Sequence, residues 1–526
     1  MNILITGAKG FVGRNLAENL KNIRDGKNRT AGLSVGVCGG GKCGKCRVRI
    51  LSGAVSETPD ADGCVLSCKA KLLSDTVIAE IASCPIHRTQ REGSKECASG
   101  ELGVAVDIGT TTIAVSAYDL TTHAHVGTLT AKNPQSVFGA DVISRISAST
   151  EHLSELSSCV RTALSNMTSS LCAGGSIKRA VIAANTVMSE LLLGNDPRYL
   201  ADAHATLSHR RALRLHGAAC KASTGILADE ITLFPHISPF VGGDITAGIL
   251  SLFPTPPAEP ALLCDLGTNG EVALLYGNDI ISSSAAAGPA FEGGGIECGM
   301  EYAAGAIAHV SDSENTLTLD VVGKKTPVGI CGSGICDALA FMLRRGIIKR
   351  DGSFAPRSEL PDAFATRVRG GRFYLTGNVY ISQEDVRAFQ LARAAVKCAV
   401  DAVCARLGTP PSTIFVAGGF GSAADPDALR TLGILPQGAK AAAVGCSALG
   451  GAKMLLLCPE LLSRAEDIAA RAVNIPLALS ENFEQDFINR IAPYTSNVFV
   501  TTLCVDYKKD EYTYIDKIPI YVVNDT

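Results

Sequence analysis

The sequence contains no tryptophan, and only 5% of its 526 residues are aromatic. It also lacks an excess of either charge, since 48 Lys and Arg accompany 51 Asp and Glu, which gives a net charge of −3. Neither sign clusters strongly along the chain. Proteins that bind nucleic acid or anionic membrane surfaces usually carry a basic patch, so we expect neither of these partners.

Long apolar runs are also missing. The longest one, residues 441–458, is interrupted by Gly450, Gly451 and Lys453, and we expect it to form a buried helix and not a membrane span. The chain does not open with the charged and apolar regions of a secretory signal, so we expect a cytoplasmic protein. In that compartment the 19 Cys favour reduced thiols and metal ligation over a disulfide framework.

Glycine, in contrast, is abundant, at 53 residues, and it marks a motif that occurs twice. Asp107-Ile-Gly-Thr-Thr-Thr112 and Asp265-Leu-Gly-Thr-Asn-Gly270 each follow an apolar run and precede a second strand-like run, at 113–118 and 272–276. This pattern predicts two β-hairpins whose tips expose backbone N–H groups, hydroxyls and one carboxylate, which suits a phosphate and Mg²⁺. One copy would more often be an ordinary turn. Two copies favour an internal duplication that clamps a nucleotide between its halves.

The first 25 residues resemble the opening βα unit of the extended short-chain dehydrogenase and nucleotide-sugar epimerase family. In that family glycines such as Gly7, Gly10 and Gly13 let a dinucleotide pyrophosphate approach a helix N-terminus. The resemblance then stops, because no ribose-binding carboxylate follows a second strand and no Tyr-x-x-x-Lys occurs in the chain. NAD-dependent epimerase or dehydrogenase activity is therefore the least favoured hypothesis.

Three cysteines share one glycine-rich loop. Cys38, Cys43 and Cys46 have the C-x₄-C-x₂-C spacing of a plant-type [2Fe–2S] site with a distant fourth ligand. Leu-Ser-Cys68 resembles a ferredoxin strand start, which favours Cys68 over Cys64 as that ligand. The alternative is zinc, but zinc sites favour paired C-x₂-C motifs. The usual first hairpin of a ferredoxin would fall in the epimerase-like segment, which leaves the completeness of this domain open.

Polar residues also follow predicted strands, where α/β sheets bind ligands. Asn185 follows an apolar strand at 179–183, and Asp244 follows two glycines. Each is either a helix cap or a ligand-binding residue, and the pattern does not separate the two. Cys331 and Cys336, which flank a Gly-Ser-Gly turn, are interpreted as incidental thiols in preference to metal ligands.

Together the motifs resemble the reductive activators of corrinoid-dependent enzymes over about residues 31–493. The resemblance rests on the order of the Cys cluster, Asp-Ile-Gly-Thr-Thr-Thr112, Asn133-Pro-Gln…Gly-Ala-Asp-Val-Ile-Ser-Arg145, Asp-Leu-Gly-Thr-Asn-Gly-Glu271, Ala-Ala-Gly-Pro-Ala-Phe-Glu-Gly293, Gly-Ile-Cys-Gly-Ser-Gly334 and Ala-Gly-Gly-Phe-Gly421. That family joins a [2Fe–2S] domain to an ATPase of the acetate kinase, sugar kinase, Hsc70 and actin superfamily. The resemblance therefore implies an α/β fold with a duplicated RNase H-like ATPase domain, preceded by a small ferredoxin-like α+β domain.

The expected domain organisation combines this resemblance with changes in composition. Residues 84–102 are polar and of mixed charge, which is typical of a linker. The predicted parts are an epimerase-like βα fragment at 1–30, a [2Fe–2S] domain at 31–83, the linker at 84–102, ATPase subdomain I at 103–259, ATPase subdomain II at 260–493 and a C-terminal extension of unknown role at 494–526.

The resemblance also implies roles for individual residues. The two Asp-x-Gly-Thr motifs become phosphate loops, and the turn at 418–421 becomes an adenosine loop. We assign Asp107 and Asp265 to positioning Mg²⁺ or water, and Glu271 to a supporting catalytic role. The predicted nucleotide-binding residues are Gly109, Thr110, Thr111, Asn185, Asp244, Gly267, Thr268, Asn269, Gly270, Gly332, Ser333, Gly334, Gly418, Gly419 and Gly421, and the predicted cluster ligands are Cys38, Cys43, Cys46 and Cys68.

The activity implied by the resemblance is an ATP-dependent one-electron reduction. The [2Fe–2S] cluster would take an electron from a cellular donor and pass it to the Co(II) corrinoid protein of a methyltransferase system, which restores Co(I). Because plant-type clusters lie near about −400 mV, this step is uphill and needs the free energy of ATP. The alternatives are a small-molecule kinase of the same superfamily and a non-catalytic redox or partner-binding module. A homodimer is left open.

Overall fold

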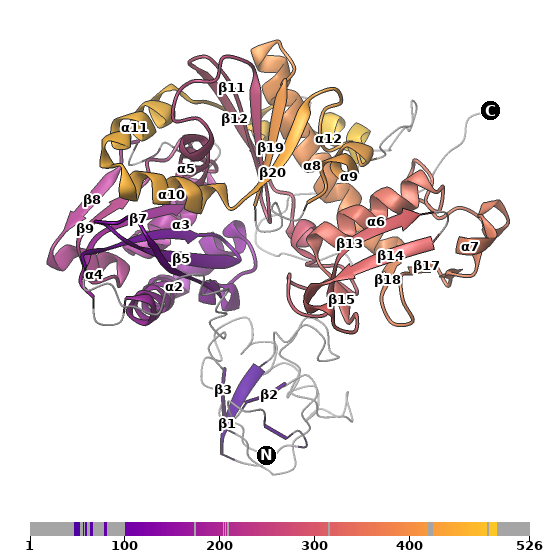
Figure 1. The fold of residues 1–526 in the computed structure, drawn as a ribbon, viewed down its shortest axis with the longest axis horizontal. Coiled ribbons are helices and arrows are strands. Elements are labelled where there is room, and N and C mark those ends of the chain that lie inside the picture. Colours follow the sequence, from indigo (N-terminus) through magenta and orange to yellow (C-terminus); the bar gives the residue numbers. More distant parts are fainter. Residues whose placement is uncertain are drawn as a thin grey trace.

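The structure is a computed structural model that describes residues 100–491, apart from 173–174, 203–204, 206, 208–209, 314–315, 419–423 and 481–482. Before residue 100 it describes 47–52, 56, 58–59, 64–66 and 78–81. The predicted epimerase-like segment, the four predicted cluster ligands, most of the predicted linker and the C-terminal extension lie outside the described residues. Of the predicted ferredoxin-like domain, the structure describes an antiparallel sheet β2-β1-β3, at the bottom of Figure 1. Its strands are β1 (Arg47–Ser52), β2 (Cys64–Leu66) and β3 (Ile78–Ile81).

Two six-stranded sheets form the centre of the molecule (Figure 1). The first sheet has the order β6-β5-β4-β7-β9-β8, and the second has the order β20-β19-β10-β11-β12-β21. The first contains β4 (Leu102–Ile108), β5 (Thr112–Asp119), β6 (His125–Lys132), β7 (Ile177–Ala184), β8 (Leu213–His216) and β9 (Ala228–Leu233). The second contains β10 (Ala261–Leu266), β11 (Gly270–Tyr276), β12 (Asp279–Ala285), β19 (Thr413–Ala417), β20 (Lys440–Gly445) and β21 (Val473–Ile475).

The two sheets share a five-strand topology. In the first, the antiparallel meander β4-β5-β6 pairs in parallel with β7, which pairs in parallel with β9. In the second, the meander β10-β11-β12 pairs in parallel with β19, which pairs in parallel with β20. Strand order and direction therefore repeat, and the predicted duplicated α/β fold is confirmed.

Helices cover both faces of the sheets, which explains why β4 and β10 are almost continuously apolar. The outer face of the first sheet packs against α2 (Val142–Leu171), α3 (Thr186–Leu193) and α4 (Ala218–Thr224). The second sheet packs against α8 (Gln383–Leu407), followed by α9 (Pro426–Thr431) and α12 (Phe483–Ile491). The space between the sheets holds α5 (Gly243–Leu252), α10 (Ser447–Leu457) and α11 (Leu462–Arg471).

Helices α5 and α10 cross at very short range. A Cβ at Gly451 would lie 2.0 Å from the carbonyl oxygen of Ala247, and one at Gly248 would lie 2.7 Å from Oγ of Ser447. The apolar core around this crossing includes Ala105 of the first sheet and Leu263 of the second. The two halves of the duplication therefore share one core, and glycine allows the contact between their helices.

A segment inserted between β12 and α8 forms the lobe at the right of Figure 1. It contains the sheets β14-β13-β15 and β16-β17-β18, together with η3 (Pro289–Glu292), α6 (Gly332–Arg344) and α7 (Asp362–Ala365). The strands are β13 (Ala306–Ser313), β14 (Thr316–Val321), β15 (Gly329–Ile330), β16 (Val368–Arg369), β17 (Arg372–Tyr374) and β18 (Tyr380–Ser382).

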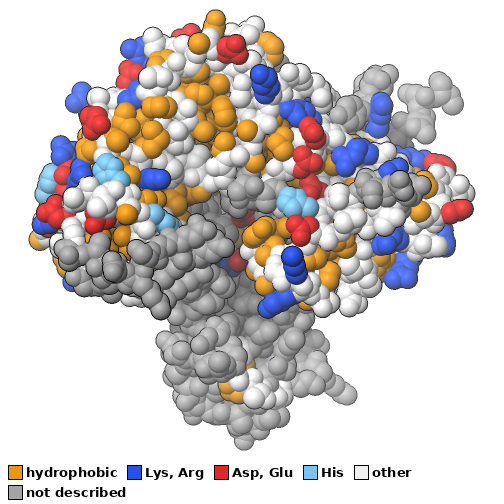
Figure 2. Space-filling view, viewed as in Figure 1, with side chains coloured by type: hydrophobic (Ala, Val, Ile, Leu, Met, Phe, Trp, Pro, Cys, Tyr) orange, Lys and Arg blue, Asp and Glu red, His pale blue; other side chains and the backbone are white. Residues whose placement is uncertain are grey.

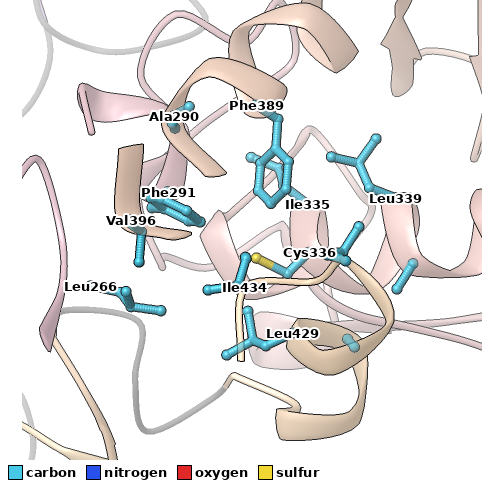
Figure 3. Close-up of a cluster of buried hydrophobic side chains, with 14 of the residues drawn as sticks. Leu266, Ala290, Phe291, Ile335, Cys336, Leu339, Phe389, Val396, Leu429 and Ile434 are labelled. Atoms are coloured by element: carbon cyan, nitrogen blue, oxygen red, sulfur yellow. The ribbon is translucent and has the colours of Figure 1, made fainter. Parts of the chain in front are cut away.

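The insert is anchored to the second sheet by an apolar cluster. Figure 3 shows Phe291 and Ile335 of the insert together with Leu266 of β10 and Phe389 of α8. Cys336 lies in the same cluster and is fully buried, so its thiol packs there as an apolar side chain. Phe291 directly precedes Glu292, so this cluster also holds the backbone of the η3 turn at Glu292 in place.

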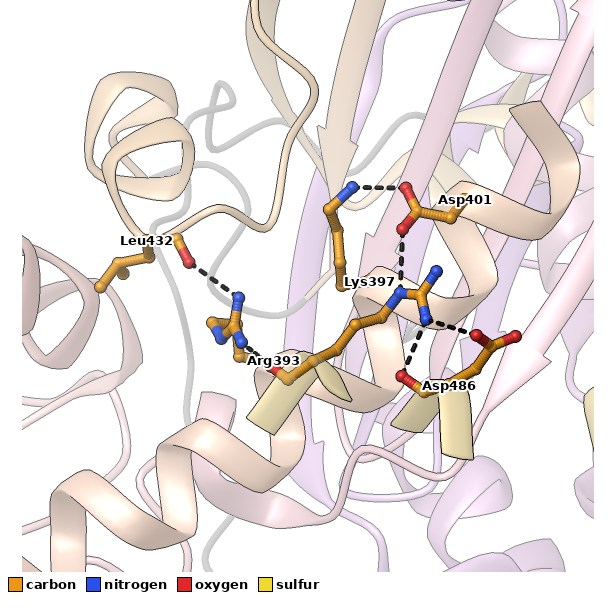
Figure 4. A network of polar contacts seen from close by, with 6 residues as sticks. Arg393, Lys397, Asp401, Leu432 and Asp486 are labelled. Carbon is orange, nitrogen blue, oxygen red and sulfur yellow. Dashed lines mark hydrogen bonds and ion pairs between the residues drawn. The ribbon is translucent and has the colours of Figure 1, made fainter. Parts of the chain in front are cut away.

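A polar network attaches α12 to α8 (Figure 4). Nε of Arg490 donates to Asp401 at 2.9 Å, and the same side chain forms an ion pair with Asp486 at 3.2 Å. Lys397 also pairs with Asp401, and Arg393 donates to the carbonyl of Arg490. The contacts of Arg490 with Asp401 and Arg393 therefore hold the C-terminal helix of the described fold against α8.

One expectation for the apolar stretch 441–458 is wrong. The stretch does not form a single helix but contains most of β20 followed by the helix α10. Gly445 adopts a left-handed conformation, with φ 66°, which ends the strand before Ser447 starts the helix. Among the described residues, no helix combines the length and apolar character that a membrane span requires. On the face in Figure 2, acidic and basic side chains of the described residues lie interspersed.

Candidate functional site

The tips of the two predicted hairpins face each other. The β4–β5 hairpin closes with Ile108 opposite Ile113, and the β10–β11 hairpin closes with Leu266 opposite Gly270. Oγ1 of Thr111 lies 3.3 Å from Oγ1 of Thr268, although 157 positions separate them in sequence. The prediction that the two Asp-x-Gly-Thr motifs form hairpin tips is therefore confirmed, and the fold brings both tips to one place.

Glu292, at the end of η3, contacts both tips. Its Oε2 accepts hydrogen bonds from Oγ1 of Thr111 at 2.6 Å and from Oγ1 of Thr268 at 3.1 Å. Its Oε1 accepts from the backbone N–H of Thr268 at 3.3 Å. A Cβ on Gly267 would lie 3.2 Å from the same oxygen, so a glycine there leaves room for the carboxylate. A single side chain therefore joins the two halves of the duplication.

A buried polar network holds the first tip from behind. Asn133 donates its backbone N–H to the carbonyl of Thr111 at 2.8 Å and its amide to the carbonyl of Gly109 at 2.9 Å. Arg145 donates to the carbonyl of Thr110 at 2.6 Å. Asn133 and Arg145 are fully buried, and burial lowers the pKa of Arg145 to about 10. The guanidinium still carries its charge at neutral pH, and three consecutive carbonyls of the tip are satisfied.

Asn185 caps a helix, which is one of the two roles that the sequence left open, and it also contacts the first tip. As the N-cap of α3, its Oδ1 accepts from the backbone N–H of Met188 at 2.9 Å. Its Nδ2 donates to Oγ1 of Thr110 at 3.1 Å. Gly242 lies directly against it, since a Cβ there would be 2.4 Å from Cα of Asn185. The start of α5 therefore packs against the start of α3, whose cap residue contacts the first tip.

Four acidic side chains gather beneath the tips. Burial is the largest cause of a raised pKa in each, to about 6 for Asp107, about 7 for Asp244 and about 8 for Asp265. The pKa of Glu271 is raised well above its ordinary value, first by burial and then by the neighbouring charges of Asp244 and Asp265. Because Asp107, Asp244 and Asp265 each raise the pKa of at least one neighbour in this group, the group would gain from a nearby cation. Within the described residues, however, no set of three or more His, Cys, Asp or Glu is arranged to hold a metal ion directly.

Asp244 occupies the first turn of α5 but is not its cap, since the N-cap position belongs to Gly242. Its Oδ1 accepts from the adjacent backbone N–H of Ile245 at 2.8 Å. Of its two predicted roles, helix capping is therefore wrong, because the chain enters α5 two residues earlier. The side chain instead joins the acidic group.

The predicted adenosine loop begins against the second tip. Gly418 has φ 110°, and a Cβ there would lie 2.2 Å from the carbonyl oxygen of Leu266 and 3.0 Å from Oδ1 of Asp265. Both the conformation and the close approach require glycine. Gly419 and Gly421 lie outside the described residues.

The predicted Gly332-Ser333-Gly334 turn makes different contacts. Oγ of Ser333 donates to the carbonyl of Ala308 at 2.8 Å, and a Cβ at Gly334 would lie 2.3 Å from the carbonyl oxygen of Ile307. The contacts that the structure shows for this turn pack α6 against β13 and do not involve the hairpin tips.

Sequence reasoning missed four residues that shape the site. Glu292, Asn133 and Arg145 stand inside motifs that identified the family resemblance, so a signal was present, but the motifs did not show which atoms these side chains reach. Cys446 carried no signal. Its Sγ donates to Oδ2 of Asp107 at 3.0 Å, and β20 and α10 bring it there.

Comparisons with known protein families cover most of the chain. A model described as the C-terminal domain of RACo, the ASKHA domain, matches residues 259–502. A model of the RACo middle region matches 102–252, and one of the 2Fe-2S iron-sulfur cluster binding domain matches 16–73. The corrinoid activation enzyme RamQ of Eubacterium limosum is 31% identical over 414 residues, which cover 73% of this chain and 69% of that protein. The chain belongs to the RACo family of reductive activators of corrinoid proteins.

Two further proteins are similar to the chain. The [Co(II) methylated amine-specific corrinoid protein] reductase of Methanosarcina barkeri is 28% identical over 301 residues, 52% of this chain and 53% of that protein. A solved structure of a reductive activator for corrinoid, iron-sulfur protein is 26% identical and has a TM-score of 0.66, covering 90% of this chain and 95% of that one. These findings confirm the predicted family and the predicted fold class, an ASKHA domain with an N-terminal [2Fe–2S] domain.

Proposed function

We propose that this chain reduces the cobalt of a corrinoid protein from Co(II) to Co(I) and uses ATP to drive the step. The observation that carries the proposal is the pair of facing hairpin tips, joined through Thr111 and Thr268, in a chain that also matches a 2Fe-2S domain. The relatives named above are corrinoid activation and reductase proteins, which supports the same substrate class.

ATP would bind between the two tips. Gly109 and Gly267 allow the backbone to approach the phosphates, and the hydroxyls of Thr111 and Thr268 would donate to them. Gly418 begins the loop that would face the adenosine. The residues fit an anion at this place, because one hydroxyl from each tip and one backbone N–H from the second tip already converge on one carboxylate.

A Mg²⁺ ion would accompany the nucleotide, held by Asp107 and Asp265 directly or through water. A divalent cation would lower the pKa of these buried carboxylates and favour their charged forms. Glu271 and Asp244 would add negative charge behind the first two without contacting the phosphates. This arrangement positions phosphates and water, which is most of what phosphoryl chemistry requires.

The free energy of ATP is needed because the electron transfer is uphill. Each ~59 mV of mismatch costs a factor of ten for one electron. Closure of the two halves on ATP, followed by hydrolysis and release, would couple that free energy to the partner. Helices α5 and α10, which touch at Gly451 and Ala247, are the contact about which such a closure would occur.

The electron itself would come from a [2Fe–2S] cluster held by Cys38, Cys43, Cys46 and Cys68 and refilled by a cellular donor. The corrinoid protein would belong to a methyltransferase system. Matching the cluster domain to the 2Fe-2S family supports this ligand set, since three of the cysteines share the C-x₄-C-x₂-C loop.

The cluster is tested by anaerobic EPR and absorbance spectra of the full chain, with iron and sulfide counted, before and after dithionite. We expect a [2Fe–2S] signal that Cys43→Ala and Cys68→Ala abolish. Cys64→Ala provides the matched control, because it removes the competing thiol and should leave the signal intact. A protein that stays free of iron after reconstitution would contradict the electron-transfer function.

A further inference from the structure

We propose that Glu292 competes with the terminal phosphate of ATP for the hydrogen-bond donors of the two hairpin tips. The inference rests on the proposed function, because it assumes that ATP binds between these tips. Its basis is a set of three hydrogen bonds that the structure shows directly.

The groups that donate hydrogen bonds to Glu292 are also the ones that a phosphate at this place would need. They are the hydroxyl of Thr111 in the first half, and the hydroxyl and backbone N–H of Thr268 in the second. A carboxylate is a planar anion and a phosphate is a tetrahedral one, and the oxygens of both accept several such hydrogen bonds. The two hydroxyls lie 3.3 Å apart, so one anion can reach both. The carboxylate and the phosphate cannot hold the same three donors at once.

The charge around Glu292 makes the competition consequential. The carboxylate lies close enough to Asp265 to contribute to the raised pKa of that residue, after burial and after the charges of Asp244 and Asp107. No cationic side chain contacts Glu292 in the hydrogen bonds and ion pairs shown for the described residues. The charge of Arg145 acts on Glu292 without a hydrogen bond or ion pair between the two side chains. The three donors are therefore the direct contacts that stabilise the carboxylate, and an incoming phosphate would take them.

The backbone around Glu292 is suited to a second position. Gly288 and Gly293 flank the η3 turn and both have positive φ, 73° and 79°. Glu292 itself is partly exposed, whereas Phe291 beside it is fully buried in the apolar cluster of Figure 3. The cluster would hold the turn in place while the carboxylate moves off the tips when ATP arrives.

The competition has a direct consequence for affinity. Glu292→Gln keeps the size of the side chain but removes its charge, which weakens the hydrogen bonds to both hydroxyls. The terminal phosphate then meets a weaker competitor, so Mg–ATP should bind about tenfold more tightly. Mg–ADP lacks that phosphate, so its affinity should change by less than about twofold.

Calorimetric titration of the full chain with Mg–ATP and Mg–ADP tests the proposal. Glu292→Asp serves as a second variant, since its shorter side chain keeps the charge but cannot reach both hydroxyls, and it should also favour ATP over ADP. Glu301→Gln is the matched control, because Glu301 is an exposed carboxylate of the same insert that pairs with Lys132 of the first half at 3.5 Å. Thermal unfolding verifies that each variant is folded.

The outcomes separate the two claims. A gain in ATP affinity without a matching gain for ADP in either folded Glu292 variant, with Glu301→Gln unchanged, supports the competition. Equal or weaker ATP binding by the folded variants overturns the competition and leaves the proposed function standing. A wild-type chain that binds neither nucleotide overturns the proposed function itself.

Discussion

The thiol of Cys446 donates a hydrogen bond to Oδ2 of Asp107 at 3.0 Å, across 339 positions of sequence. The bond links the start of α10 to the end of β4, so the region matched by the C-terminal RACo model completes the site that the middle region begins. It also opposes the effect of burial, which raises the pKa of Asp107 to about 6.

Removing this donor should slow ATP hydrolysis. In Cys446→Val the carboxylate of Asp107 loses a hydrogen bond, which is worth roughly 1–2 kcal/mol to a charged acceptor, so we expect turnover to fall about tenfold. Cys446→Ser keeps a donor at the same place and should stay within about threefold of wild type. Steady-state ATP hydrolysis distinguishes the variants. Equal rates for the Val variant and wild type would mean that the contact does not matter for catalysis.

The close crossing of α5 and α10 should tolerate no side chain at Gly451. A Cβ there would meet the carbonyl oxygen of Ala247 at 2.0 Å, so Gly451→Ala must push the helices apart, at a cost of about 1–3 kcal/mol. Gly450→Ala is the control on the same helix, because its nearest neighbour would be Cβ of Ser251 at an ordinary 3.5 Å. Thermal unfolding should show a lower melting temperature for Gly451→Ala alone. A similar loss in both variants would argue against the crossing as the cause.

The buried guanidinium of Arg145 should be needed for the shape of the first tip. Arg145→Met fills much of the same space but leaves the carbonyl of Thr110 without its donor, which we expect to cost about 2 kcal/mol of stability. The Michaelis constant for ATP should also rise, since the tip loses its support. Arg198→Met, at an exposed ion pair with Asp196, is the control and should change neither. Denaturant unfolding and ATP kinetics measure the two effects, and a loss of stability with unchanged kinetics would contradict the positioning role.

The acidic group should reduce stability as the pH rises when no cation is bound. Burial raises the pKa of Asp265 from 3.8 to about 8, so the folded protein binds this proton more tightly than the unfolded one. The stabilisation that the proton provides is complete below about pH 4 and is lost between about pH 4 and pH 8. Asp265→Asn removes that loss. Its melting temperature, measured without Mg²⁺ and nucleotide, should match wild type near pH 4.5 and exceed it increasingly up to pH 8.

Asp265→Asn should also lose ATP hydrolysis. The carboxylate whose charge destabilises the fold is the one proposed to hold Mg²⁺ or water. If the difference in melting temperature between Asp265→Asn and wild type does not depend on pH, the charge of Asp265 does not destabilise the folded protein. Activity retained by Asp265→Asn would contradict the assigned role.

The sequence predicted the scaffold of the site well, because the scaffold depends on local patterns. The apolar runs around Asp107 and Asp265 and the glycines between them define the hairpins without knowledge of the rest of the fold. Their repetition predicted the duplication, and strand order confirms it. Asn185 could be placed at a strand end, but its two contacts could not be chosen from sequence, since both need the same amide.

The parts that could not be predicted depend on distant contacts. Glu292 stands 181 positions from Thr111, and nothing local indicates that η3 lies over both tips. Cys446 reaches Asp107 because Gly445 ends β20, a turn that the apolar composition of 441–458 concealed. The Gly-Ser-Gly turn at 332–334 has the composition of a ligand loop, but its close packing against β13 explains its glycines equally well.

The most direct test of the account is the formation of Co(I) in a corrinoid protein. A purified methyltransferase corrinoid protein in the Co(II) state is mixed anaerobically with the reduced chain, freed of excess dithionite, and followed by absorbance with Mg–ATP, with a non-hydrolysable analogue, or without nucleotide. Of the three nucleotide conditions, we predict that only Mg–ATP gives Co(I). The variants Asp107→Asn and Cys43→Ala should each abolish its formation. Co(I) forming equally fast without ATP, or undiminished in either variant, would contradict the central claim.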